Sequence, residues 1–237
     1  MINETKVALV TGANKGIGKE IARGLARKGM TVLLGARNPE RGRQAARELT
    51  ADGEVIFIQL DVTHEESVNA AVQEIEKRYG KLDVLVNNAG VGAARSKPGE
   101  VTTEQIRKVY ETNVFGVVTV THAILPLLRK SPAGRIVNIS SLRGSLSSPG
   151  AFVGQPSMPY SSSKTALNAL TVHYAKELAD TPIKVNAGAP GFVATDFNNF
   201  AGERTPEQGA VIAIKLATLD ENGPTGGFFD DNGSLSW

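Results

Sequence analysis

The chain contains no cysteine, and this absence excludes several kinds of site. Without a thiol among its 237 residues, there can be no disulfide, no thiolate metal site and no cysteine nucleophile. Aromatic residues are also scarce, at 5% of the sequence. The three histidines, at positions 64, 122 and 173, do not have the spacing of metal ligands, so we expect no metal.

Long apolar runs and a strong charge of one sign are missing as well. The 26 basic and 24 acidic residues are interspersed, which argues against nucleic acid or an anionic membrane as a partner. No apolar run approaches the roughly 18 residues of a membrane span. Residues 1–6 lack the apolar core of a signal peptide. We therefore expect a soluble, cytoplasmic protein.

Short apolar runs alternate with amphipathic segments along the whole chain. We predict strands over residues 7–10, 31–34, 55–59, 84–86, 135–139 and 183–187, and helices over 19–28, 41–50, 65–79 and 103–128. The strands show no polar alternation, which is typical of a parallel sheet buried on both faces. The pattern predicts an α/β fold, a single-domain Rossmann-type doubly wound parallel β-sheet flanked by helices on both faces, over residues 1–237.

A glycine-rich loop directly follows the first predicted strand and leads into a helix. Gly12 permits a tight turn, while Gly16 and Gly18 let a phosphate and the neighbouring strand approach the backbone. The free N–H groups at the helix N-terminus favour an anion such as a pyrophosphate. The spacing GxxxGxG differs from both the GxGxxG and the Walker patterns, and a purely structural turn is the alternative.

Three cations are predicted to gather near this loop. Arg37 ends the second strand, where an acidic residue usually binds a free ribose 2′-hydroxyl. Arg41 follows one turn later, and Lys15 lies inside the glycine loop. Such a cluster suits a 2′-phosphate and predicts NADP(H), with solvated surface charge as the alternative.

Tyr160 and Lys164 are the candidate acid–base pair. On a helix, positions i and i+4 lie on one face, and a neighbouring cation would lower the pKa of the phenol towards the working range. Chance alone would supply such a spacing in about one chain of this composition in five. The pair therefore gains meaning only from its surroundings.

Taken together, the motifs resemble those of the short-chain dehydrogenases/reductases over nearly the whole chain. The family resemblance rests on residues 11–18, Asp61-Val62, Asn87-Asn88-Ala89-Gly90, Asn113, Ser141, Tyr160 with Lys164, and residues 190–195. A closer resemblance, to the NADPH-dependent carbonyl reductases, rests on residues 14–18, Ala36-Arg37, Arg41-Gly42 and the final Trp237.

The resemblance implies a cofactor site for NADP(H). Asp61 and Val62 would flank the adenine, and Asn88 would contact a ribose. Lys164 would hold the nicotinamide ribose next to Tyr160. The implied cofactor-binding residues are Gly12, Asn14, Lys15, Gly16, Ile17, Gly18, Arg37, Arg41, Asp61, Val62, Asn88, Ala89, Gly90, Tyr160, Lys164, Pro190, Gly191, Val193 and Thr195.

The resemblance also implies a catalytic set of Asn113, Ser141, Tyr160 and Lys164. Hydride would pass from NADPH to a ketone or aldehyde carbon while Tyr160 protonates the oxygen and Ser141 stabilises it; both would touch substrate. Asn113 would hold a water that connects Lys164 to solvent, and a satisfied buried amide is the alternative. A register shifted by one residue would select Ser140 instead of Ser141.

Several points stay open at this stage. The enzyme could be a carbonyl reductase of broad scope or a reductase dedicated to one substrate, such as a 3-oxoacyl thioester. A cofactor-binding regulator without activity is a more remote alternative. Residues 142–158 form an extra segment before Tyr160 that could wall the pocket or obstruct tetramer formation, so a monomer and a homo-oligomer both fit. Residues 192–206 form a short substrate loop.

Overall fold

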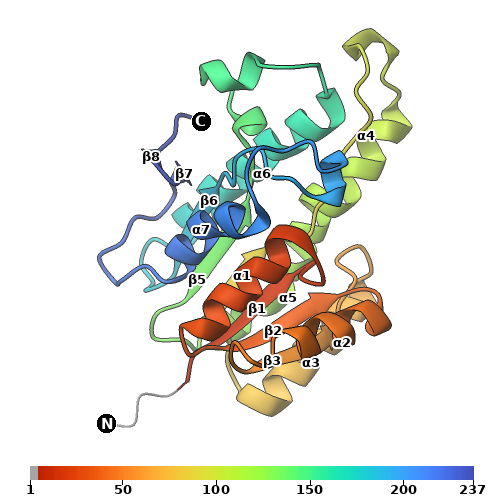
Figure 1. Ribbon diagram of the computed structural model, residues 1–237. Helices are drawn as coiled ribbons and strands as arrows, with labels where there is room; N and C mark the ends of the chain where they lie inside the picture. Colours follow the sequence, from red (N-terminus) through yellow and green to blue (C-terminus); the bar gives the residue numbers. More distant parts are fainter. Residues whose placement is uncertain (1–4) are drawn as a thin grey trace.

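The computed structural model describes residues 5–237 and contains an eight-stranded sheet (Figure 1). The strand order is β3-β2-β1-β4-β5-β6-β7-β8, and only β8 is antiparallel to its neighbour. The strands are β1 (Val7–Thr11), β2 (Thr31–Ala36), β3 (Val55–Gln59), β4 (Val84–Asn87), β5 (Arg135–Ile139), β6 (Lys184–Gly188), β7 (Phe228–Asp230) and β8 (Gly233–Ser234). This arrangement confirms the predicted doubly wound parallel sheet.

Helices cover both faces of the sheet because the strands are apolar on both sides. Along β1, Ala8 belongs to one core cluster and Leu9 to the other, so successive side chains feed opposite layers. One core is completed by α1 (Gly16–Arg27), α2 (Pro39–Glu48) and α7 (Pro206–Ala217). The other is completed by α3 (Glu65–Tyr79), α5 (Gly116–Leu128) and α6 (Met158–Glu177).

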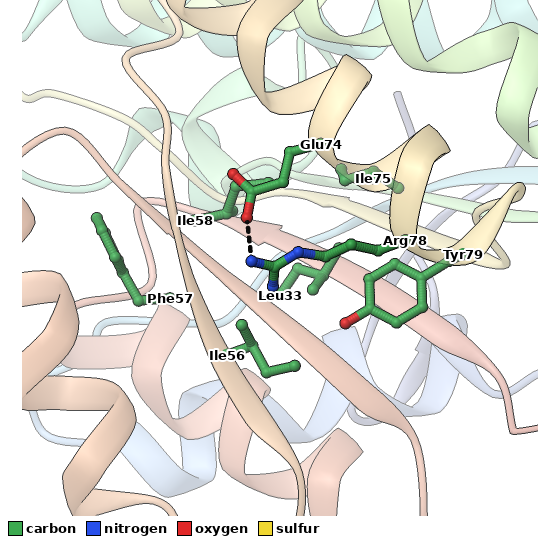
Figure 2. A pocket seen from close by; sticks show the side chains of 8 residues that line it. All are labelled: Leu33, Ile56, Phe57, Ile58, Glu74, Ile75, Arg78 and Tyr79. Carbon is green, nitrogen blue, oxygen red and sulfur yellow. Dashed lines mark ion pairs between the residues drawn. The ribbon is translucent and has the colours of Figure 1, made fainter.

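Helix α3 shows how closely the sequence specifies an element. Its bounds are those predicted, because acidic residues occupy its first turn and Gly80 ends it with a left-handed φ of 70°. Figure 2 shows its last turns beside β3, where Glu74 and Arg78 form an ion pair of 2.9 Å. The side chains around this pair pack closely and leave no room for a water molecule.

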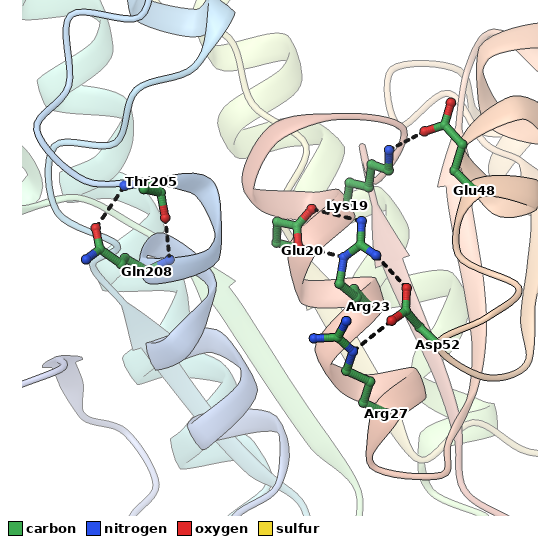
Figure 3. A network of polar contacts seen from close by, with 8 residues as sticks. All are labelled: Lys19, Glu20, Arg23, Arg27, Glu48, Asp52, Thr205 and Gln208. Carbon is green, nitrogen blue, oxygen red and sulfur yellow. Dashed lines mark hydrogen bonds and ion pairs between the residues drawn. The ribbon is translucent and has the colours of Figure 1, made fainter.

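Charged side chains on the outer face of α1 connect it to the end of α2 and the turn that follows (Figure 3). Lys19 pairs with Glu48, and Asp52 receives both Arg23 and Arg27. In the same view, Thr205 and Gln208 form a reciprocal cap at the start of α7. The Asp52 side chain is largely buried beneath the two arginines, whereas Glu48 and Arg27 are exposed.

The predicted helix over residues 103–128 is present but interrupted. Between α4 (Thr103–Tyr110) and α5 lies one π-helical turn, η2 (Glu111–Phe115). By length and composition this stretch could cross a membrane, but half of its most apolar part is buried within the fold. Residues of α5 belong to the same core cluster as residues of α3, as expected of a core helix.

Candidate active site

A cavity of about 1300 Å³ opens at the carboxyl ends of the parallel strands. It is lined by residues from the loops that follow β1 to β6, including the point between β1 and β4 where the strand order reverses. Ligands of open α/β sheets bind at this edge. All of the predicted site residues line the cavity except Arg41 and Asn113.

The glycine loop has the backbone geometry that its sequence predicts. Gly12 and Gly16 adopt positive φ values of 63° and 54°. A Cβ on Gly12 would lie 2.9 Å from the Ala89 Cα, and one on Gly18 would collide with the Asn88 amide nitrogen. The loop therefore depends on glycine both for its turn and for close contact with the segment after β4.

The side chain of Asn88, which follows β4, is hydrogen-bonded to this loop. Its side-chain nitrogen donates to the carbonyls of Thr11, at 2.9 Å, and Gly12, at 3.2 Å. The Thr11 hydroxyl in turn accepts the backbone N–H groups of Asn88 and Ala89, at 3.0 and 2.9 Å. Thr11 was not among the predicted site residues, although its place as the last residue of β1 could have indicated this role.

The three predicted cations do not gather as expected. Arg37 lines the cavity, whereas Arg41 does not and instead lies in the first turn of α2, which Asn38 caps. Lys15 lines the cavity but forms an ion pair with Asp196 of the substrate loop. The prediction overlooked this carboxylate because it is 181 residues away in the sequence.

Asp61 and Val62 follow β3 and form another part of the wall. Although burial raises the pKa of the Asp61 carboxyl, hydrogen bonds from the backbone and side chain of Thr63 hold it below its ordinary value. The Thr63 donors lie 3.0 and 2.7 Å from the Asp61 Oδ1. Asp61 is therefore an anionic acceptor fixed at the rim of the cavity.

Ser141 and Tyr160 both line the cavity. Ser141 lies two residues after the end of β5, Tyr160 lies in the first turn of α6, and Ser141 is near enough to lower the pKa of Tyr160 as a hydrogen-bond partner. The neighbouring Ser140 is buried and donates instead to the Asn168 side chain at 2.5 Å. The structure thus favours Ser141 over the register shifted by one residue.

Lys164 lies one helical turn beyond Tyr160, with its Nζ 5.8 Å from the centre of the tyrosine ring. Its ammonium group is buried and donates to the Ile139 carbonyl at 2.7 Å. Burial lowers the pKa of Lys164 to about 8. Lys164 is therefore mostly protonated at neutral pH but can release its proton close to physiological pH.

The pKa of Tyr160 differs from the sequence-based expectation. Burial raises it above its ordinary value, while the hydrogen bond with Ser141 and the positive charge of Arg143 act in the opposite direction. The lowering that we predicted from Lys164 is not what the structure gives. The phenol therefore stays protonated at neutral pH, the form needed of a proton donor.

Asn113 lies in the π-helical turn and is fully buried. Its amide group exchanges hydrogen bonds of 2.8 and 3.0 Å with the backbone of Val91 and donates to Ser163 of α6 at 3.0 Å. A Cβ on Gly90 would meet both its Oδ1 and the Lys164 Nζ within 4 Å. Asn113 thus connects three segments behind the cavity, and π-helical turns are frequent at functional sites.

The wall opposite Tyr160 comes from the segment after β6. Pro190, Gly191, Val193 and Thr195 all line the cavity, as predicted. The ring of Phe197, in the next turn, contacts the Tyr160 ring edge to face, with centres 5.4 Å apart. Phe197 was not predicted, because its distance in sequence from Tyr160 leaves no local signal.

No group of three or more histidine, aspartate or glutamate residues that could hold a metal ion occurs within residues 5–237. The cavity instead offers two hydroxyl groups, a buried ammonium group and a glycine-rich loop with an arginine nearby. This combination suits a dinucleotide and a proton transfer.

Comparison with known proteins agrees with this geometry. The family model of the short chain dehydrogenases matches residues 6–206. The chain belongs to the short-chain dehydrogenase/reductase family. Members of this family are oxidoreductases with a nicotinamide cofactor.

Carbonyl reductases are among the relatives of this short-chain dehydrogenase/reductase. Carbonyl reductase (NADPH) 1 of Bos taurus is 34% identical over 282 residues, and the match covers 100% of both chains. Salutaridine reductase of Papaver bracteatum is 33% identical, covering 97% of this chain and 95% of the relative. The structure of NADPH-bound carbonyl reductase from chicken fatty liver superposes with a TM-score of 0.89 at 26% identity, covering 98% and 99% of the two chains.

Proposed function

We propose that this protein is an NADPH-dependent carbonyl reductase that converts ketones or aldehydes to alcohols and can run in reverse. The observation that carries the proposal is that Ser141, Tyr160 and Lys164 line the same cavity as the glycine loop. A hydride donor held along the loop and a proton donor at Tyr160 can then act on one carbonyl group. We further propose that the protein is cytoplasmic, acts on small molecules and functions as a monomer or a homo-oligomer.

The residues present fit a nicotinamide dinucleotide. The backbone at Gly12, Gly16 and Gly18 leaves room that a side chain would fill, and it adjoins the N-terminus of α1, which favours a pyrophosphate. Arg37 and Lys15 both line the cavity, and their charges suit a 2′-phosphate, which supports NADPH over NADH. Asp61 and Val62 would hold the adenine.

The bound cofactor would supply the hydride, and the protein would supply the proton and the electrostatics. Tyr160, protonated at neutral pH, would donate its hydroxyl proton to the carbonyl oxygen. Ser141 would donate a hydrogen bond to the same oxygen and stabilise its developing negative charge. Lys164 would fix the nicotinamide ribose and pass a proton towards Tyr160, and Asn113 would hold a water for its resupply.

The experiment follows NADPH absorbance in the presence of aldehydes, ketones, quinones and 3-oxoacyl thioesters. The proposal predicts turnover with simple ketones or aldehydes. Consumption with 3-oxoacyl thioesters alone would point to the dedicated reductase. NADPH binding without turnover of any carbonyl compound would contradict the proposal and indicate a non-catalytic regulator.

A further inference from the structure

Arg143 lies two residues after Ser141 and is not explained by the mechanism above. It occupies the 3-10 helix η3 (Leu142–Gly144) and lines the cavity. Its backbone N–H donates to the Ser141 hydroxyl oxygen at 3.2 Å. The main chain of this arginine is thus hydrogen-bonded to a proposed catalytic group.

The guanidinium group of Arg143 reaches across to the far part of the extra segment. Its Nη1 donates to the Gln155 carbonyl and its Nη2 to the Val153 carbonyl, each at 3.0 Å. Between them, Gly154 has a φ of 81°, and a Cβ there would lie 2.8 Å from the Nη2. The turn at residues 153–155 therefore fits closely around the guanidinium.

This turn has few other means of staying in place. The Val153 side chain is 69% exposed, the Phe152 side chain before it is 80% exposed, and Gly154 and Gln155 are also exposed. Yet Val153, Gly154 and Gln155 all line the cavity. A wall without a core of its own needs a polar anchor, and two charge-assisted hydrogen bonds from one planar group can supply it.

We propose that Arg143 is a positioning residue that holds the turn 153–155 as a wall of the substrate pocket. The proposal rests on the proposed carbonyl reductase activity of the site. It assigns residues 142–158 a function in shaping the pocket for bulky carbonyl compounds.

Three variants test the wall. Arg143→Gln removes the guanidinium, Arg143→Lys keeps the charge but not the two-carbonyl geometry, and Gly154→Ala displaces the turn while keeping the arginine. Arg47→Gln, an exposed side chain at the far end of α2, is the control. KM and kcat are measured for a small aldehyde and a bulky aromatic ketone, and amide hydrogen exchange is followed over residues 146–157.

We expect all three variants to raise KM for the bulky ketone by about tenfold, with a much smaller change for the aldehyde and faster exchange over 146–157. Unchanged KM and exchange in Arg143→Gln would overturn the proposal. If the wild type turns over no carbonyl compound, the proposed function fails, but hydrogen exchange still tests the wall.

Discussion

At the residue scale, the most unusual group is the buried ammonium of Lys164. A lysine whose pKa falls from 10.5 to about 8 on folding disfavours the folded state while it is charged. Lys164 therefore lowers the stability of the folded state while it is charged. Strongly shifted pKa values of this kind are frequent at functional sites.

This cost predicts a particular pH dependence of stability. Between pH 8 and pH 10.5, the unfolded chain retains a proton on Lys164 that the folded protein has lost, so the free energy of unfolding should rise with pH in this window. Chemical denaturation of wild type and Lys164→Met at several pH values isolates the effect. The stability of wild type relative to the variant should increase by at most about 1.4 kcal/mol per pH unit.

The matched control for this measurement is Lys176→Met, an exposed lysine on the same helix. Its difference from wild type should not change across the window in this way. A flat difference for Lys164→Met as well would mean that the lysine is not desolvated as the structure indicates.

Arg37 carries the prediction for cofactor preference. Replacing it with aspartate should weaken NADPH binding by roughly ten- to a hundredfold while affecting NADH far less, because a charge-assisted contact to the 2′-phosphate is lost. Fluorescence titration with both cofactors measures this. Arg41→Asp is the comparison, and we expect a smaller loss because Arg41 does not line the cavity. Equal losses of NADPH and NADH in Arg37→Asp would contradict the 2′-phosphate assignment.

At the element scale, Arg135 connects three segments at the end of the sheet opposite the cavity. It begins β5, and its buried guanidinium donates to the carbonyls of Gly134, Pro182, Leu219 and Asp220 at 2.8–3.2 Å. Burial lowers its pKa. The acceptors in these bonds are all backbone carbonyls, and none is a carboxylate.

Loss of the Arg135 hydrogen bonds should markedly lower the stability of the protein. Arg135→Leu removes a buried group that donates to four carbonyls, and we expect it to lower the free energy of unfolding by about 3 kcal/mol. Urea denaturation at pH 7 measures the change. Arg129→Leu, which removes an exposed pair with Glu177, should cost less than about 1 kcal/mol. Similar losses in the two variants would show that the carbonyl cluster is not important for stability.

The elements also show what the sequence could predict. The bounds of β3, α3 and β5 agree with the predictions, because their apolar runs are flanked by clear turn and cap residues. The three residues of β7 and two of β8 were missed, since strands so short carry no periodicity. The π-helical turn around Asn113 was missed too, because it leaves the apolar pattern of residues 103–128 unbroken.

At the scale of the whole molecule, the sheet brings together loops that the sequence separates. The order of the strands places the loops after β1, β4, β5 and β6 along one edge, which is why motifs from residue 12 to residue 195 line one cavity. The resemblance of those motifs to a family identified most of these residues. The partners Asp196, Phe197 and Arg143 were not predicted, because their contacts depend on how loops fold over one another.

The most direct test of the central claim is the rate of NADPH oxidation by Tyr160→Phe with a ketone or aldehyde that the wild type reduces. The variant keeps the ring against Phe197 and removes only the proposed proton donor. We expect kcat to fall by at least about a hundredfold while NADPH still binds. A purified Tyr160→Phe enzyme with near wild-type kcat would contradict the account.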